Sequence, residues 1–212
     1  MTDELVFYTN PQSRGRIVRW ILEEIGQPYR TEVLDYGTSM KCAEYLAINP
    51  MGKVPAITHR GQTITECAAI CAYLADAFPE AGLAPPTQDR ARYYRWLFFA
   101  AGPVEQAVTN KALQIDVPAE RERMVGYGNM GCVLDALEGA LDGRDYIASD
   151  RFTAADCYVG AQLFWGMMMF GSIEKRPTFE AYVERLIARP AYRRATAIDE
   201  GLAPAPTPAA AG

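Results

Sequence analysis

The sequence predicts an α/β domain followed by an all-α domain. Short strand-like and helix-like segments alternate through residues 1–79, whereas residues 88–202 show apolar patterns of helical period and no convincing strand. A proline-rich segment, residues 80–87, lies between the two patterns and cannot continue a helix. We therefore expect two domains joined by a short linker, with a disordered tail of low complexity over residues 203–212.

The elements of the first domain follow from their apolar spacing and their turn residues. The pattern predicts, in order, strand Leu5–Tyr8, helix Ser13–Ile25, strand Tyr29–Leu34, helix Lys41–Ile48, hairpin strands Val54–Thr58 and Gln62–Ile64, and helix Ala68–Phe78. Gly26 is expected to end the first helix, and Pro28 to open the next strand. The order β-α-β-α-β-β-α predicts a small mixed sheet with helices on its faces.

The second domain is expected to be a helical bundle. Its predicted helices are Asp89–Lys111, Pro118–Leu141, Thr153–Phe170 and Pro177–Arg189. Thr153 and Asp156 have the spacing of a capping box, in which each side chain bonds to the backbone of the other residue at a helix start.

Composition and charge exclude several classes of protein. The net charge of −5 argues against a nucleic-acid-binding face, which is normally basic. No apolar run reaches the roughly 18 to 20 residues of a membrane span, and the first residues lack the basic start and apolar core of a signal peptide. We therefore expect a cytoplasmic protein without a membrane partner.

The cysteines and the single histidine exclude further classes. The five cysteines form no Cys-x-x-Cys pair and no metal-ligand spacing, so we expect reduced thiols and no metal site. His59 is the only histidine, and it lies in a predicted turn between two strands. Neither a Ser-His-Asp triad nor a site with several histidine ligands is therefore expected.

Two motifs predict a site for a small peptide that carries carboxylates. The segment Asn49–Pro55 reads as a turn into a strand, and Pro55 interrupts the backbone pairing, so a cis bond before it would expose main-chain groups. The segment Thr65–Ile70 places an acid and a small polar residue at the start of an apolar helix. Free amides at that helix start, together with the helix dipole, favour an anion.

In order and distance, these two motifs resemble those of the cytosolic glutathione transferase family, bacterial type. The resemblance implies a thioredoxin-like first domain, a helical second domain and glutathione as co-substrate. It places Glu66 and the Cys67 amide at the γ-glutamyl group, Val54 main-chain atoms at the cysteinyl part, and Lys41 and Lys53 near the glycyl carboxylate. Cys67 stands where the family usually has serine, so a weak thiol donor replaces a hydroxyl.

The same resemblance implies a hydroxyl that donates to the glutathione thiolate. A free thiol has a pKa of about 8.5, so the thiolate needs a donor at neutral pH. We assign this catalytic role to Ser13, at the start of the first predicted helix, because Ser13-Arg14 before an amphipathic helix is similar to bacterial transferases. A helix cap is the structural alternative for Ser13, and Tyr8, Asn10 and Gln12 remain alternatives for the sulfur contact.

The expected activity is attack of the thiolate on a small hydrophobic electrophile, in a homodimer. Glutathione-dependent peroxide or disulfide reduction and a non-catalytic interaction protein with this fold are the alternatives. Aromatic residues of the first bundle helix, such as Tyr93 and Trp96, could line the electrophile pocket or form the core. The cluster from Trp165 to Phe170 could serve as core, pocket or dimer surface.

Overall fold

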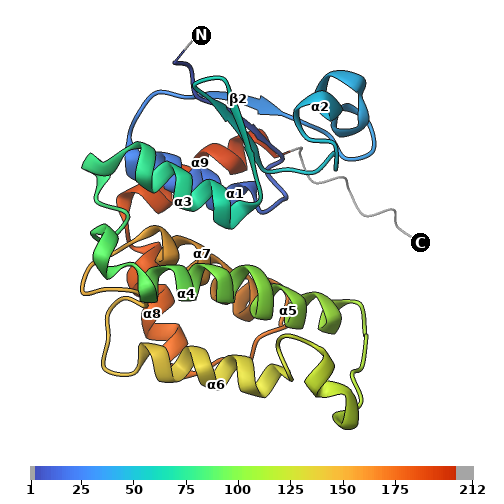
Figure 1. Ribbon diagram of the computed structural model, residues 1–212, viewed down its shortest axis with the longest axis vertical. Coiled ribbons are helices and arrows are strands. Elements are labelled where there is room, and N and C mark those ends of the chain that lie inside the picture. The colour runs from blue at the N-terminus through green and yellow to red at the C-terminus, as the bar shows by residue number, and fades with distance from the viewer. Residues whose placement is uncertain (1–2, 204–212) are drawn as a thin grey trace.

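The computed structural model describes residues 3–203 of the 212-residue chain. Figure 1 shows a region of sheet and helices above a region built of helices alone. The predicted fold class, an α/β domain followed by a helical one, is confirmed. The domain limits at 79, 87 and 202 stay a prediction, and the expected tail lies, apart from Ala203, outside the described residues.

The first region has the predicted order of elements. They are β1 (Val6–Thr9), α1 (Gly15–Ile25), β2 (Arg30–Val33), α2 (Ala43–Ile48), β3 (Ala56–His59), β4 (Gln62–Thr65) and α3 (Cys67–Ala77). The sheet order is β2-β1-β3-β4, in which β1 runs parallel to β2 and antiparallel to β3, and β3 and β4 form a hairpin. The sheet is therefore mixed, as the sequence predicts.

The strand alternation divides the core of this region between the two faces of the sheet. Phe7 and Ile57 pair across β1 and β3 and pack in the large core with α1 and α3. Tyr8 and Ala56, the next pair, belong to a second cluster with Tyr45 of α2. Neighbouring strand residues point to opposite faces, so α2 covers one face while α1 and α3 cover the other.

Helix α1 starts and ends at turns that the sequence largely predicts. Gly26 ends the helix in the left-handed conformation, with φ of 69°, and its amide donates to the Leu22 carbonyl at 3.0 Å. The start lies at Gly15 and not at Ser13, because the Gly15 amide donates to Ser13 Oγ in a local turn. The predicted boundary was two residues early.

Proline also explains where β3 begins. The Val54-Pro55 peptide bond is cis, the case in which the sequence predicts exposed main-chain groups. The strand starts at Ala56, so the predicted start at Val54 was wrong. Pro55 has no amide hydrogen to give to the sheet, so pairing begins only after it.

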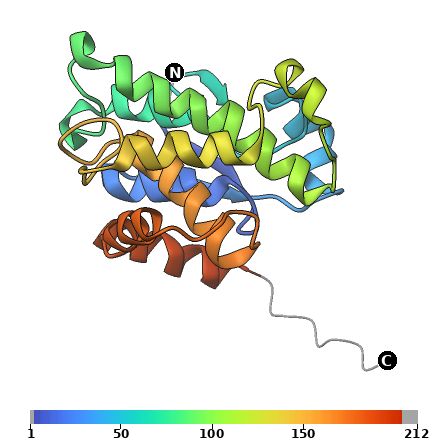
Figure 2. The same cartoon turned by 90° about the horizontal axis from the view of Figure 1, so that it is seen from below.

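The second region contains α4 (Ala91–Phe99), α5 (Glu105–Ala112), α6 (Met130–Leu141), α7 (Ala154–Phe164) and α8 (Pro177–Ile187). A π-helical turn, Ala100–Val104, joins α4 to α5 and contains Pro103, which cannot donate within a helix. Figure 2 shows α4 and α5 running alongside α6 when the molecule is seen from below. A second π-helical turn, Trp165–Met169, follows α7.

The predicted helix Pro118–Leu141 was wrong in its first half. Residues Ala119–Met124 form a 3₁₀ helix, and α6 begins only at Met130. Asn129 caps α6 by accepting from the Cys132 amide at 2.9 Å, and Gly128 just before it has φ of 65°. A turn that needs a left-handed residue therefore separates the two helices.

The capping box at the start of α7 is confirmed. Asp156 accepts from the Thr153 amide at 2.8 Å and from the Thr153 hydroxyl at 2.9 Å. The same carboxylate accepts from the Ile147 amide and from the Tyr182 hydroxyl, both at 2.8 Å. Asp156 thus joins the loop before α7 to α8 in the buried core.

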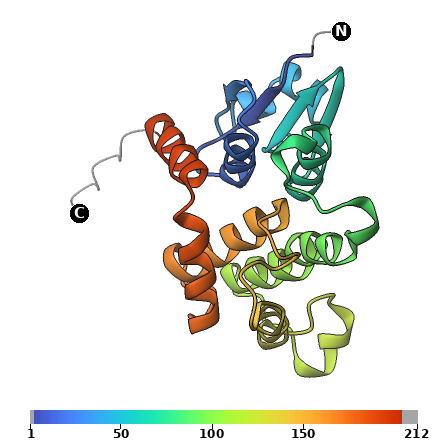
Figure 3. The same ribbon diagram turned by 90° about the vertical axis from the view of Figure 1, so that its left-hand side faces the viewer.

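One helix, α9 (Pro190–Leu202), was not predicted from the sequence. It packs against α1 of the first region, and Figure 3 shows the two helices side by side. Within residues 3–203, no helix has the length and apolar character needed to cross a bilayer. The same residues contain no cluster of three side chains suited to a metal ion.

Candidate functional site

A cleft of about 590 Å³ lies between the two regions. The amino-terminal side of its wall comes from the turn before α1, from Tyr36 and from the segment before β3. The opposite side comes from α5, from α7 and from the π-helical turn after α7. The lining residues are Pro11, Gln12, Ser13, Arg14, Arg16, Tyr36, Lys53, Val54, Val108, Gln162, Trp165, Gly166, Met169, Phe170 and Ala203.

Ser13 lines this cleft in the turn that leads into α1. Its hydroxyl donates to the Asn10 carbonyl at 2.7 Å and accepts from the Gly15 amide at 2.9 Å. A Cβ on Gly15 would stand 2.0 Å from Thr9 Oγ1 and 2.9 Å from Ser13 Oγ, so a glycine is required there. The turn holds the Ser13 hydroxyl at the cleft, and its proton must leave Asn10 before it can reach a bound sulfur.

The alternatives to Ser13 lie in different places. Tyr8 packs beside Tyr45 on the α2 face of the sheet, with 5.6 Å between the ring centroids. Asn10 is buried, and its amide donates to the Leu34 carbonyl at 2.8 Å and accepts from the Gln12 amide at 2.9 Å. Neither residue lines the cleft, whereas Gln12 does. The nitrogen and the oxygen of the Asn10 side chain therefore both form hydrogen bonds that stabilise the turn.

The structure brings three of the six predicted site residues to this cleft. Lys53 and Val54 line it together with Ser13. Lys41 lies next to them outside the lining, and its ammonium group donates to the carbonyls of Met51 at 3.1 Å and Gly52 at 2.9 Å. Lys41 therefore holds the turn that presents Lys53.

Glu66 and Cys67 stand at the start of α3, outside the lining of the cleft. Glu66 is exposed and has φ of 64°, a left-handed conformation that a non-glycine residue rarely adopts. Cys67 is buried, and its thiol contacts the Arg14 carbonyl at 3.9 Å. The hydrogen bond with Cys71, together with burial, raises the pKa of the Cys67 thiol well above its ordinary value. Cys67 is therefore a thiol at neutral pH.

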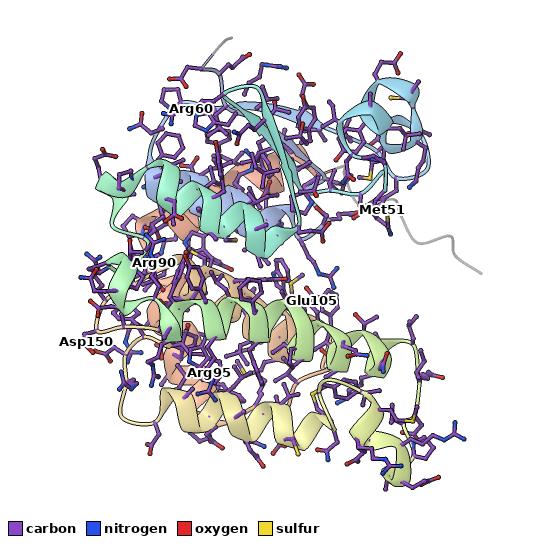
Figure 4. The ribbon with its side chains drawn as sticks, in the orientation of Figure 1. Met51, Arg60, Arg90, Arg95, Glu105 and Asp150 are labelled. Atoms are coloured by element: carbon purple, nitrogen blue, oxygen red, sulfur yellow. The ribbon has the colours of Figure 1, made fainter. Side chains whose placement is uncertain are left out.

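An ion pair that the sequence analysis missed joins the two regions beside the cleft. The Arg14 guanidinium donates through two nitrogens to both carboxylate oxygens of Glu105, the first residue of α5. Glu105 also accepts from Gln162 and, at 3.5 Å, from the Tyr158 hydroxyl. The hydrogen bond to Glu105 raises the pKa of Arg14. Figure 4 shows Glu105 on the helical side of the gap between the regions.

The apolar wall of the cleft comes from the segment that follows α7 and not from α4. Trp165, Met169 and Phe170 line it, and Phe170 is 69% exposed. Tyr93 and Trp96 are buried in the core, so of the two possible places for them, the pocket and the core, the structure supports the core. These side chains belong to the cluster from Trp165 to Phe170, for which a pocket was one of the expected roles, and the π-helical turn Trp165–Met169 carries two of them.

Two parts of the chain match models of known protein families. The family model described as Glutathione S-transferase, N-terminal domain, matches residues 13–77, and the one described as Glutathione S-transferase, C-terminal domain, matches residues 114–190. Glutathione S-transferase GstA of Escherichia coli O157:H7 is 32% identical over 162 residues, which cover 75% of this chain and 79% of that protein.

Solved structures give the same result over nearly the whole chain. A glutathione transferase from Methylococcus capsulatus strain Bath aligns with a TM-score of 0.77 at 30% identity, covering 92% of this chain and 98% of the other. A sphingomonad glutathione S-transferase complexed with glutathione aligns with a TM-score of 0.75 at 30% identity, covering 93% and 100%. The chain therefore belongs to the glutathione S-transferase family.

Proposed function

We propose that this protein binds glutathione, activates it as a thiolate and transfers it to a small hydrophobic electrophile. The observation that carries the proposal is the shared cleft of Ser13, Lys53 and Val54, opposite the apolar wall of Trp165 and Phe170. A peptide thiol held along the first set of residues would present its sulfur toward the second. Proximity of the two reactants lowers the barrier without any covalent role for the protein.

In the proposed reaction, Ser13 turns its hydroxyl from the Asn10 carbonyl toward the sulfur. The thiol loses its proton to solvent, and the hydroxyl hydrogen bond stabilises the thiolate that remains. The sulfur then forms a bond with the electrophilic carbon, and the leaving group departs with its electron pair. Glu66 would accept from the ammonium group of glutathione, with the Cys67 amide at its α-carboxylate and Lys41 and Lys53 near its glycyl end.

The buried state of Cys67 favours conjugation over chemistry by a protein thiol. A thiol of raised pKa is a poor nucleophile near neutral pH, and no cysteine lines the cleft among the described residues. Peroxide reduction would therefore have to use the glutathione sulfur alone. A non-catalytic interaction protein of the same fold is the remaining alternative.

We further propose a cytoplasmic homodimer. Tyr94 and Phe98 are 40% and 68% exposed, one turn apart on α4, and could pack against a second copy. Light scattering on the protein as it elutes from a size-exclusion column would give its mass in solution. A single-copy mass at micromolar concentration would contradict the dimer.

The test of the function is a calorimetric titration with glutathione, followed by a panel of aryl halides, unsaturated ketones and organic hydroperoxides. We expect binding in the micromolar to millimolar range and conjugation of at least one carbon electrophile. Reaction with hydroperoxides alone would favour the reductase alternative. Glutathione binding without any reaction would favour the interaction protein.

A further inference from the structure

The cleft carries positive charge in a protein that is acidic as a whole. Its lining includes Arg14, Arg16 and Lys53, and the described residues contribute no Asp or Glu to it. The whole chain, in contrast, has a net charge of −5. A cationic pocket in an acidic protein concentrates anionic ligands.

Two of the three cations already have partners or an assigned role. Arg14 is held by both carboxylate oxygens of Glu105. Lys53 stands beside Val54, where the proposed function places the glycyl end of glutathione. Arg16 remains as a cation that the binding of glutathione does not use.

Arg16 is half-buried, and its position on α1 is fixed by a bond from its amide to the Ser13 carbonyl at 3.2 Å. Its Nε is buried and has no hydrogen-bond partner. None of the ion pairs found within residues 3–203 includes Arg16. The Nε atom has no exposed surface, so a ligand in the cleft would have to bind the terminal nitrogens of this guanidinium.

Burial raises the pKa of Asp199, and the charges of Arg19 and Arg16 oppose this rise. Asp199 compensates the charge of Arg16 only in part, because its ion pair is formed with Arg19. Arg16 lines both the cleft and a small void of about 20 Å³, whose wall includes Tyr192 and Asp199. Asp199 lies on the void side, and its Oδ1 is already bonded to Arg19 at 2.7 Å. Trp165 also lines both spaces.

We propose that Arg16 determines substrate specificity by binding a carboxylate on the electrophile, so that the preferred second substrates are apolar, aromatic acids. The inference rests on the proposed function, because it concerns the second substrate of that reaction. Trp165, Met169 and Phe170 would contact the apolar body while Arg16 receives the charged end. Planar bidentate recognition of carboxylates is what a guanidinium does best.

With an aryl chloride that carries a carboxylate, the transfer is a substitution that needs no reactant other than glutathione. The glutathione thiolate adds to the carbon that bears chlorine, a carbon–sulfur bond forms, the carbon–chlorine bond breaks, and chloride leaves with the electron pair. The substrate carboxylate stays ionised throughout and serves only for binding. Arg16 is therefore a binding residue and takes no proton.

The test compares two ligands that differ only by the carboxylate, S-benzylglutathione and S-(4-carboxybenzyl)glutathione. Calorimetry on the wild-type protein should give at least about tenfold tighter binding of the carboxylated ligand, which corresponds to about 1.4 kcal/mol. In Arg16→Gln this preference should vanish while the affinity for S-benzylglutathione is kept, and Arg16→Lys should keep part of it. Arg193→Gln, an exposed arginine on α9, makes the same charge change away from the cleft and should behave as the wild type.

Equal affinity of the wild-type protein for the two ligands would overturn the proposal. An equal loss of affinity for both ligands in Arg16→Gln would also overturn it. Turnover separates this failure from a failure of the proposed function. If the methyl ester of 4-chloro-3-nitrobenzoic acid is conjugated with a KM no higher than that of the free acid, the transferase stands and the role of Arg16 falls. If the wild-type protein binds neither glutathione conjugate, both proposals fall.

Discussion

Arg19 on α1 and Asp199 on α9 form an ion pair in which Nε and Oδ1 lie 2.7 Å apart and each side chain is only 1% exposed. The same guanidinium donates to the hydroxyls of Tyr29 and Thr31, both at 3.1 Å. This pair fastens the last helix to the first one. It also fixes the end of α9, where Ala203 contributes to the cleft.

Replacement of Asp199 by alanine should strongly destabilise the protein. The change leaves the Arg19 charge buried, and losses of about 3–5 kcal/mol in the free energy of unfolding are typical when one partner of such a pair is removed. Urea unfolding measures this. Arg194→Ala is the control. The Arg194 side chain is exposed in its ion pair with Glu23, so this pair should contribute less than about 1 kcal/mol to the free energy of unfolding. Equal effects of the two changes would contradict a buried, tightly coupled pair.

Asp156→Ala should also be destabilising, for a different reason. Four donors from the loop before α7, from its start and from α8 converge on this carboxylate. Loss of the acceptor leaves buried donors without a hydrogen bond. One such donor lowers the free energy of unfolding by about 1–3 kcal/mol. Asp150→Ala, at a fully exposed position in the same loop, is the matched control for thermal unfolding. A melting temperature equal to that of the control would contradict the capping role.

The His59 imidazole should make the protein less stable in mild acid. Burial lowers its pKa below the ordinary 6.5, so the unfolded chain takes up a proton at a higher pH than the folded protein does. The contribution to stability is therefore present above about pH 6.5 and is lost as the pH falls. His59→Gln should flatten the change in urea midpoint between about pH 7 and about pH 5 relative to the wild type. An unaltered slope would show that His59 does not titrate differently in the two states.

Local signals in the sequence predict most of the fold. The apolar spacing in α1, its stop at Gly26 and the capping box of Thr153 and Asp156 depend on neighbouring residues, which the sequence displays directly. The early start assigned to β3 and the helix assigned through residues 118–129 failed where a proline or a left-handed glycine interrupts an otherwise regular pattern. Helix α9 was missed because its buried side chains are Ala191, Ala195 and Asp199, an unusually small and polar face.

The parts of the site that depend on neighbouring residues could be predicted from the sequence, and the parts that depend on distant residues could not. The turn that contains Ser13 and the segment with Lys53 and Val54 could be predicted, because each is a short motif that reaches the cleft from its own element. The pair of Arg14 with Glu105 could not, because the partners are separated by 91 positions and meet only when the two regions pack together. An Arg beside the expected catalytic serine was the one available signal.

Glu66→Ala tests the expected γ-glutamyl contact. Removing a charged acceptor from the ammonium group should weaken glutathione binding by about 1–3 kcal/mol, a factor of roughly five or more in the dissociation constant. Calorimetry at constant ionic strength measures this directly. Gln62→Ala, on the exposed end of β4, is the control and should bind as the wild type. Unchanged affinity in Glu66→Ala would remove this residue from the site.

The pKa of the glutathione thiol in the complex shows whether Ser13 activates the bound glutathione. Thiolate absorbance against pH should show the bound thiol ionised near neutral pH in the wild-type protein. In Ser13→Ala, loss of one hydrogen bond to the charged sulfur, about 1.5–3 kcal/mol, should raise that pKa by roughly one to two units and slow conjugation. Tyr8→Phe and Gln12→Ala should leave both quantities as they are. A thiol pKa and a rate that are the same in Ser13→Ala as in the wild type would show that Ser13 does not stabilise the thiolate.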